Sequence, residues 1–169
     1  MAEVRRSAGL LLFRSRGGGT EPLGPAAGDV EVLLGHMGGP YWEGRDERAW
    51  SIPKGEHTPD EEATAAARRE FEEELGLAPP AGEWLPLGEA RQSSGKVVTV
   101  WALAGELDTS LVNPGTFTLE WPPRSGRTAE FPEIDRAEWF GLDVARVKLV
   151  SGQRVFLDRL AELLAHGPG

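Results

Sequence analysis

The 169-residue chain contains no cysteine and no long apolar run. Without cysteine, a disulfide scaffold, a thiolate metal site and a cysteine nucleophile are all excluded. No stretch approaches the roughly 20 apolar residues that a membrane span requires. The apolar run 8–13 is shorter than a signal-peptide core, and a charged loop follows it in place of a cleavage site. We therefore expect a protein of the cytoplasm.

Positive charge is also scarce. The chain has 18 basic and 27 acidic residues, which gives a formal net charge of −9. A broad surface that holds nucleic acid or an anionic membrane needs clustered lysines and arginines. We therefore expect no nucleic-acid partner and no membrane partner. Taken as a total, the charge disfavours a phosphate-rich ligand as well.

The remaining composition is that of a globular protein, with 40% hydrophobic and 27% charged residues. Its length predicts a single domain, residues 1–169. Strands are expected at 7–14, 30–36, 50–52, 83–91, 96–107 and 138–140, the first two as a hairpin around a loop at 17–28. Helices are expected at 61–75, 143–150 and 153–165, and the segment 113–130 is expected to be irregular. The mixture predicts an α/β (or α+β) fold with a mixed sheet.

The helix at 61–75 has the clearest sequence signals. Thr58 is a suitable N-cap, and Pro59 suits the first helical position. Gly76 is a natural C-cap. Three apolar residues recur at four-residue spacing and are expected to face the core: Ala63, Ala67 and Phe71.

The same helix concentrates the negative charge. Residues 60–74 include seven acids and two bases, so more than half of the net charge lies in this segment. Glu70, Glu73 and Glu74 are spaced i, i+3 and i+4, which places their side chains on one helix face, where they repel one another. A divalent cation would reverse this penalty, and oxygen ligands favour magnesium, manganese or calcium over zinc. The alternative is a solvated acidic face paired with Arg68 and Arg69.

The segment 55–77 resembles the Nudix box, the signature of hydrolases that act on a nucleoside diphosphate linked to another group. Every fixed position of that pattern is filled: Gly55, Glu61, Arg69, Glu70, Phe71, Glu73, Glu74, Gly76 and Leu77. The resemblance implies a Nudix-type α/β/α sandwich with a mixed central sheet. It also implies magnesium-dependent hydrolysis of a phosphoanhydride bond, with manganese as a substitute.

The resemblance assigns roles to these residues position by position. Glu73 and Glu74 would be metal ligands, and Glu70 would be a ligand, a general base or both. The carbonyl of Gly55 would complete the coordination. Arg69 and Glu61 would orient the carboxylates, as groups behind metal ligands do.

The flanks of the box carry further resemblances. The stretch 50–55 resembles the W-x-x-P-K-G sequence of Nudix enzymes that hydrolyse dinucleoside polyphosphates and diphosphoinositol polyphosphates, and Lys54 would contact phosphate. In the dinucleoside polyphosphate branch, an acid shortly before a W-x-G-L stretch acts on the metal or the base. Glu133 is the first candidate here and Glu130 the second, while an ordinary surface acid is the alternative for each.

Tyr41 and Trp42 stand in a loop before the box, where exposed aromatic residues can stack on a nucleobase. Tyr41 is the only tyrosine of the chain, so the tyrosine that dinucleoside polyphosphate enzymes often have after the box is missing. The substrate is therefore open between dinucleoside polyphosphates and nucleoside triphosphates, including oxidised ones. Another nucleoside diphosphate derivative, a diphosphoinositol polyphosphate and a non-catalytic nucleotide-sensing module are alternatives. The chain is expected to be a monomer or a homodimer.

Overall fold

The computed structural model describes residues 4–15 and 30–166, so the loop expected at 17–28 lies outside the described residues. The strands are β1 (Arg6–Ser15), β2 (Val30–Met37), β3 (Trp50–Ser51), β4 (Lys54–His57), β5 (Leu85–Arg91), β6 (Val97–Ala104), β7 (Thr116–Glu120), β8 (Thr128–Pro132) and β9 (Ile134–Gly141). The helices are α1 (Ala63–Leu75), α2 (Leu142–Lys148) and α3 (Arg154–His166), with short 3₁₀ turns at Thr109–Leu111 and Ser151–Gln153.

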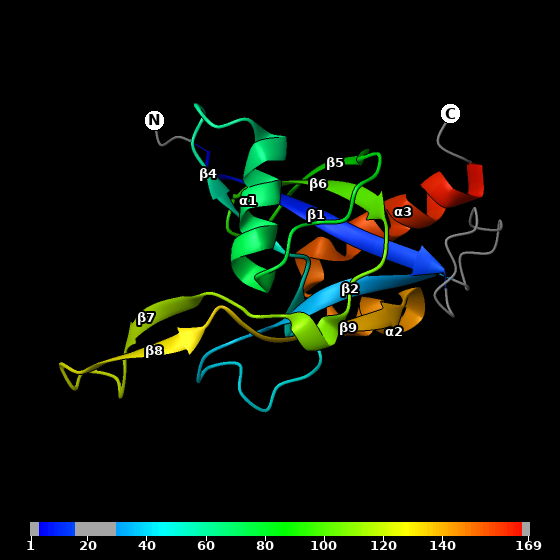
Figure 1. Ribbon diagram of the computed structural model, residues 1–169. Coiled ribbons are helices and arrows are strands. Elements are labelled where there is room, and N and C mark those ends of the chain that lie inside the picture. The colour runs from blue at the N-terminus through cyan, green and yellow to red at the C-terminus, as the bar shows by residue number, and fades with distance from the viewer. Residues whose placement is uncertain (1–3, 16–29, 167–169) are drawn as a thin grey trace.

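One mixed sheet forms the centre of the molecule (Figure 1). Its strands run in the order β3-β2-β1-β6-β5, with β4 also paired to β1 and β9 to β2. Strands β1 and β6 are parallel, whereas β1 and β2 are antiparallel. The expected mixed sheet is therefore confirmed, and so is the expected pairing of its first two strands.

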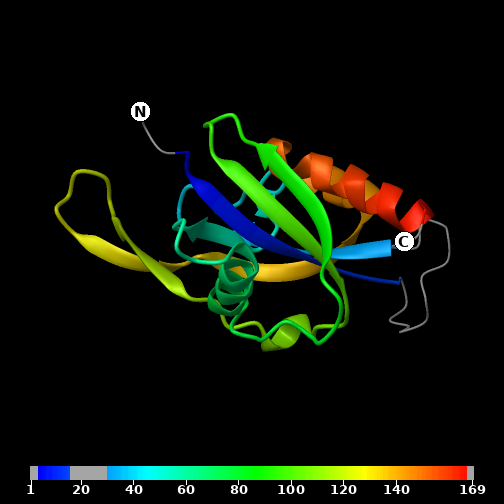
Figure 2. The ribbon, with the colours of Figure 1, turned by 90° about the horizontal axis from the view of Figure 1, so that it is seen from above.

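Strand β1 joins two hydrophobic cores, because successive side chains of a strand point to opposite faces. Leu10 and Leu12 belong to the core under α1. Leu11 and Phe13 belong to the core under α2 and α3. Seen from above, α1 and α3 lie on opposite sides of the sheet (Figure 2). The predicted α/β/α sandwich is confirmed, and its central strand explains the unbroken apolar run near the start of the chain.

Helix α1 ends as predicted but begins later. Gly76 adopts φ 71°, and its N–H bonds the carbonyl of Glu72 at 2.8 Å, so the predicted C-cap is confirmed. The expected N-cap Thr58 and first helical residue Pro59 are wrong, because the helix begins at Ala63 with Glu62 as its N-cap. The carbonyl of Thr58 accepts the N–H of Glu61 at 3.1 Å and closes a separate turn before the helix. In a continuous helix, Glu61 and Arg69 would lie about 12 Å apart along the axis. The turn folds Glu61 back within reach of Arg69.

Contrary to the expectation of an irregular segment, residues 113–130 contribute to a hairpin. Strands β7 and β8 pair antiparallel, with Thr116 opposite Pro132 and Glu120 opposite Thr128. They form a separate two-stranded sheet, which projects from the body of the molecule in both views (Figures 1 and 2). We call this hairpin, residues 116–132, the arm.

Strand β4 was also not expected, since its four residues show no alternating apolar pattern. It forms because it pairs with β1, with Gly9 opposite Lys54 and Ala8 opposite Gly55. Strand β9 is longer than the expected 138–140 because it pairs with β2 over most of that strand's length. Among the described residues, no helix is long and apolar enough to cross a membrane.

Candidate active site

Helix α1 and strand β4 pack against each other and together carry most of the predicted site residues. The helix contributes Arg69, Glu70, Glu73 and Glu74, and the strand contributes Lys54 and Gly55. Glu61 precedes the helix. The structure therefore brings the two ends of the motif together across the helix–strand interface.

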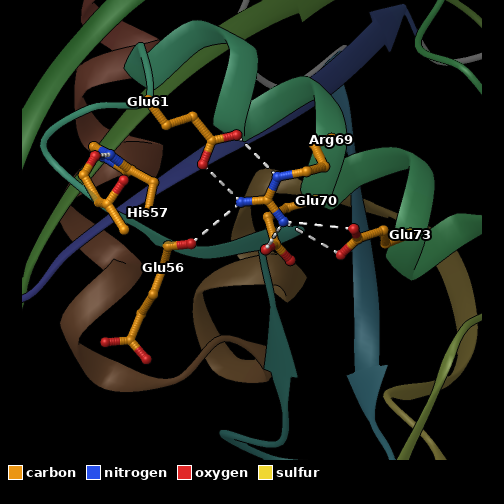
Figure 3. A network of polar contacts seen from close by, with 7 residues as sticks. Glu56, His57, Glu61, Arg69, Glu70 and Glu73 are labelled. Atoms are coloured by element: carbon orange, nitrogen blue, oxygen red, sulfur yellow. Dashed lines mark hydrogen bonds and ion pairs between the residues drawn. The ribbon is translucent and has the colours of Figure 1, made fainter.

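Arg69 is the centre of a polar network at this interface (Figure 3). Its Nε and Nη2 each donate to a different oxygen of Glu61 at 2.9 Å. Its Nη1 donates to Glu70 at 2.7 Å and lies 3.4 Å from an oxygen of Glu73, and its Nη2 donates to the carbonyl of Glu56 at 3.3 Å. The hydrogen bonds to Glu61 raise the pKa of Arg69 above its usual range, and the same bonds lower the pKa of Glu61.

Gly55 lies directly beneath the carboxyl group of Glu70. A Cβ atom added to Gly55 would overlap the carboxyl carbon and both carboxyl oxygens of Glu70. A side chain at position 55 would therefore displace that carboxylate. This close approach explains in physical terms why the motif begins with glycine.

Glu74 has the most perturbed carboxyl group of the site. It accepts a hydrogen bond from the backbone N–H of Lys54 at 3.2 Å. Burial, followed by the nearby charge of Glu70, raises the pKa of Glu74 to about 8, and Glu133 adds to the effect while Lys54 opposes it. Because burial is the main cause of the raised pKa, a cation placed beside this carboxylate would stabilise its charged form.

Glu133 reaches the same cluster from between β8 and β9. Its N–H donates to the carbonyl of Gly115 at 2.8 Å, and its carbonyl accepts the N–H of Gly38 at 3.0 Å. Burial, and then the charges of Glu70 and Glu73, raise its pKa. Glu130, the second candidate, is exposed on the arm opposite Thr118.

The three predicted substrate contacts lie in different surroundings. Burial and the neighbouring charge of Lys96 lower the pKa of Lys54, while Glu74 opposes this shift, so Lys54 stands beside the carboxylates. Tyr41 is 57% exposed and packs edge-on against Trp121 at 5.5 Å between ring centroids. Trp42 packs against the core under α2 and α3. Tyr41 is therefore the more accessible of the two aromatic rings.

A divalent cation is implied by the motif, and the donors can be tested against it. Within residues 4–15 and 30–166, no group of three or more His, Asp or Glu side chains is arranged as a metal site, and Arg69 bonds to Glu70 and Glu73 instead. The chemistry of the donors fits nevertheless. They are oxygens, which magnesium prefers, and the carboxylates of Glu70 and Glu74 both lie against β4, at Gly55 and at the N–H of Lys54.

Sequence reasoning missed the aromatic side chains of the arm, Phe117, Trp121 and Phe131. A signal for them existed, because apolar residues alternate through 117, 119 and 121 and again through 129 and 131. Alternation of this kind is typical of a half-buried strand. The prolines on either side drew attention to turns and obscured the pattern.

Comparison with solved structures defines the class of fold. A C. elegans Ap4A hydrolase, in a binary complex, aligns with a TM-score of 0.62 at 21% identity, over 95% of this chain and 99% of that one. The NUDIX domain of Shewanella oneidensis NrtR, complexed with ADP ribose, aligns with a TM-score of 0.60 at 16% identity, over 97% and 90%. A MutT protein from Methanosarcina mazei Go1 aligns with a TM-score of 0.55 at 20% identity, over 94% of each chain. A comparison with curated proteins found no match.

The family follows from the sequence. The model of the NUDIX domain matches residues 4–160, and the chain belongs to the NUDIX family. With its complete motif, it is a hydrolase that acts on phosphoanhydride bonds.

Proposed function

We propose that the chain is a magnesium-dependent pyrophosphohydrolase that cleaves a phosphoanhydride bond in a dinucleoside polyphosphate or a nucleoside triphosphate, oxidised forms included. The observation that carries this proposal is the meeting of carboxylates from two distant parts of the chain, Glu74 on α1 and Glu133 after β8, each with a raised pKa. Such a cluster is costly without a cation. The resemblance of the fold to an Ap4A hydrolase and to a MutT protein supports the nucleotide class.

The residues divide into those that hold the cation and those that serve the reaction. The expected metal ligands are Glu70, Glu73, Glu74, Glu133 and the carbonyl of Gly55. Bound magnesium would neutralise the polyphosphate and acidify a water molecule. No covalent nucleophile is needed, which agrees with the absence of cysteine.

The reaction also needs groups that position the carboxylates and the phosphates. The resemblance to the Nudix box supports Glu70 as the group that accepts the proton of the attacking water, besides its role as a ligand, and its carboxylate stands over Gly55 between the helix and the strand. Arg69, clamped by Glu61 through two hydrogen bonds, would hold Glu70 in place. Lys54 would bind a phosphate oxygen as a point charge, and the exposed ring of Tyr41 would contact a base. Trp42 would support that loop from the core side.

The test is a panel of substrates assayed with magnesium and, separately, with manganese, with the products identified by mass. The panel contains dinucleoside polyphosphates, normal and oxidised nucleoside triphosphates, ADP-ribose and a diphosphoinositol polyphosphate. Reaction in ¹⁸O-labelled water then identifies the phosphorus that is attacked. Activity on nucleotides that a chelator abolishes is the expected result.

The matched variants are Glu73→Gln and Glu74→Gln, each against Glu72→Gln. Glu72 is an exposed residue of the same helix and lies outside the fixed positions of the motif. We expect a loss of about 100-fold or more in kcat for the first two, comparable to the removal of a group that stabilises developing charge, and little change for the control. Unchanged turnover in Glu73→Gln and Glu74→Gln would contradict the proposed mechanism.

A further inference from the structure

The arm has two chemically different faces. One face is apolar and consists of Phe117, Leu119, Trp121, Ala129 and Phe131. The other is polar, exposed and consists of Thr116, Thr118, Glu120, Thr128 and Glu130. A two-stranded hairpin alone is marginally stable in water, so its apolar face requires a partner surface. Part of that surface is supplied by the loop after β2, whose Gly39 lies beneath the ring of Phe117.

The rings on this face form a continuous series. Phe117 and Phe131 lie 6.1 Å apart between centroids, Phe131 and Trp121 lie 6.4 Å apart and edge-on, and Tyr41 lies edge-on to Trp121 at 5.5 Å. Tyr41 remains 57% exposed. We call these four residues, Tyr41, Phe117, Trp121 and Phe131, the aromatic ledge.

The ledge is continuous with the carboxylate cluster. The pairing of Thr116 with Pro132 extends by one step, because the N–H of Glu133 bonds the carbonyl of Gly115 at 2.8 Å. Glu133 is a bend residue between β8 and β9, and its carbonyl accepts the N–H of Gly38 at 3.0 Å, next to the Gly39 that lies beneath Phe117. The candidate acid therefore adjoins, through its backbone, both the hairpin end and the loop that carry the rings.

The distance between Glu133 and the far end of the ledge limits which ligands can contact both. Phe131 stands two residues from Glu133, or about 7 Å along the strand. The ring of Trp121 lies one step further along the ledge, 6.4 Å from that of Phe131 between centroids. A base stacked at Trp121 and Tyr41 is thus separated from Glu133 by the ring of Phe131, at a distance of roughly 13 Å.

We propose that the aromatic ledge binds the base at the far end of a dinucleoside polyphosphate while its phosphates lie at the carboxylates. This rests on the proposed function, because it extends the same site. Aromatic side chains stack on bases of any sequence, and the intervening distance suits a long polyphosphate with a nucleoside at each end. The ledge is thereby a specificity element that favours two-base substrates over one-base substrates.

The test compares diadenosine tetraphosphate with adenosine tetraphosphate, which has the same number of phosphates and lacks the second adenosine. The variant is Trp121→Ala, with Trp121→Phe as the conservative rescue. Thr118→Ala, on the polar face of the same arm, is the matched control. We expect Trp121→Ala to raise KM for the two-base substrate about tenfold, with kcat and the one-base substrate little changed. Trp121→Phe should restore most of the loss, and thermal unfolding reports whether each variant is folded.

Equal losses on both substrates, or no loss, would overturn the proposal, as would an equal effect of Thr118→Ala. The ledge could instead be covered by a second copy of the chain, and sedimentation tests this. If the wild type is a dimer that Trp121→Ala dissociates while the kinetics stay unchanged, the ledge belongs to the dimer interface and the proposal is overturned. If the wild type hydrolyses neither compound and no other nucleotide of the panel, the proposed function fails by itself. Calorimetric binding of the two compounds then tests the ledge, and tighter binding of the two-base compound that depends on Trp121 would support it.

Discussion

At the scale of single residues, Glu74 links the electrostatics of the site to its ligand. Its pKa is raised to about 8 by burial and by Glu70, so at neutral pH the group holds a proton when no metal is bound. A carboxyl group must lose its proton to bind a metal ion. Magnesium affinity is therefore expected to rise with pH up to about 8 and to level off above it.

The proton released by this coupling is measurable. Calorimetric titration with magnesium at pH 7, in buffers that differ in ionisation enthalpy, should report release of about one proton per protein. The release should vanish well above pH 8, where Glu74 is already ionised, and should be largely lost at pH 7 in Glu74→Gln. Proton release that is the same in Glu74→Gln would assign the titration to another group.

The close approach of Gly55 to the carboxylate of Glu70 gives a second prediction at the scale of single residues. Gly55→Ala should displace the carboxylate of Glu70, which lies where the new Cβ atom would stand, and so lower kcat by about tenfold or more, since small misplacements at a catalytic site are costly. Gly95→Ala is the control. Gly95 has φ +92° and open space around it, so this change should cost stability and leave kcat unchanged. Equal kcat values for wild type and Gly55→Ala would refute the positioning role.

At the scale of elements, the end of α1 fixes where the arm begins. Gly76 has φ +71°, and an added Cβ would overlap the carbonyl of Asn113, whose N–H bonds the carbonyl of Leu75 at 2.8 Å. The N–H of Gly115 in turn bonds the carbonyl of Glu73 at 2.9 Å. The carboxyl end of the helix therefore holds the segment that leads into β7.

This junction predicts a difference between two glycine substitutions. Gly76→Ala and Gly126→Ala impose the same left-handed strain, about 1 kcal/mol, but Gly126 (φ +74°) has open space around it. We expect denaturant unfolding to show a larger loss of stability for Gly76→Ala, by on the order of 1–3 kcal/mol, because overpacking adds to the strain. Similar losses for the two variants would show that the contact with Asn113 relaxes freely.

At the scale of the whole molecule, β1 packs into two hydrophobic cores, and only one of them lies beneath the site. Leu12 lies in the core with Phe71 and Leu75 of α1, whereas Leu11 lies in the core with Phe156 and Leu160 of α3. Both leucines are fully buried. A cavity at either position should cost about 2–5 kcal/mol of stability, but only the one beneath α1 lies under the carboxylates.

We therefore expect Leu12→Ala and Leu11→Ala to lower the free energy of unfolding alike and to differ in catalysis. Leu12→Ala should lower kcat well below the wild-type value at a temperature where both variants are folded. Leu11→Ala should keep most of it. Denaturant unfolding and initial rates on the same preparations provide the measurement, and equal loss of kcat in both would show that the site responds to overall stability and not to the support beneath α1.

The sequence by itself determined the chemistry and the local geometry of the motif. The spacing of Glu70, Glu73 and Glu74 places three carboxylates on one face, and Gly76 ends the helix, because both follow from the geometry of a single helix. The mixture of elements was sufficient to predict a mixed sheet, and the resemblance of the motif to the Nudix box implied the helices on its two sides. These features depend on residues that are neighbours in the chain.

Only the tertiary structure decided the features that depend on distant residues. Strand β4 exists because β1 pairs with it, and the arm exists because two alternating segments face each other across a turn. Glu133 reaches Glu74 from 59 positions away in the sequence. No local pattern encodes such approaches, since pairing partners and the burial that shifts a pKa are set by the whole fold. The total charge disfavours a phosphate ligand, but its concentration on residues 60–74 already indicates a cation site in the sequence, and the fold adds Glu133 to that cluster.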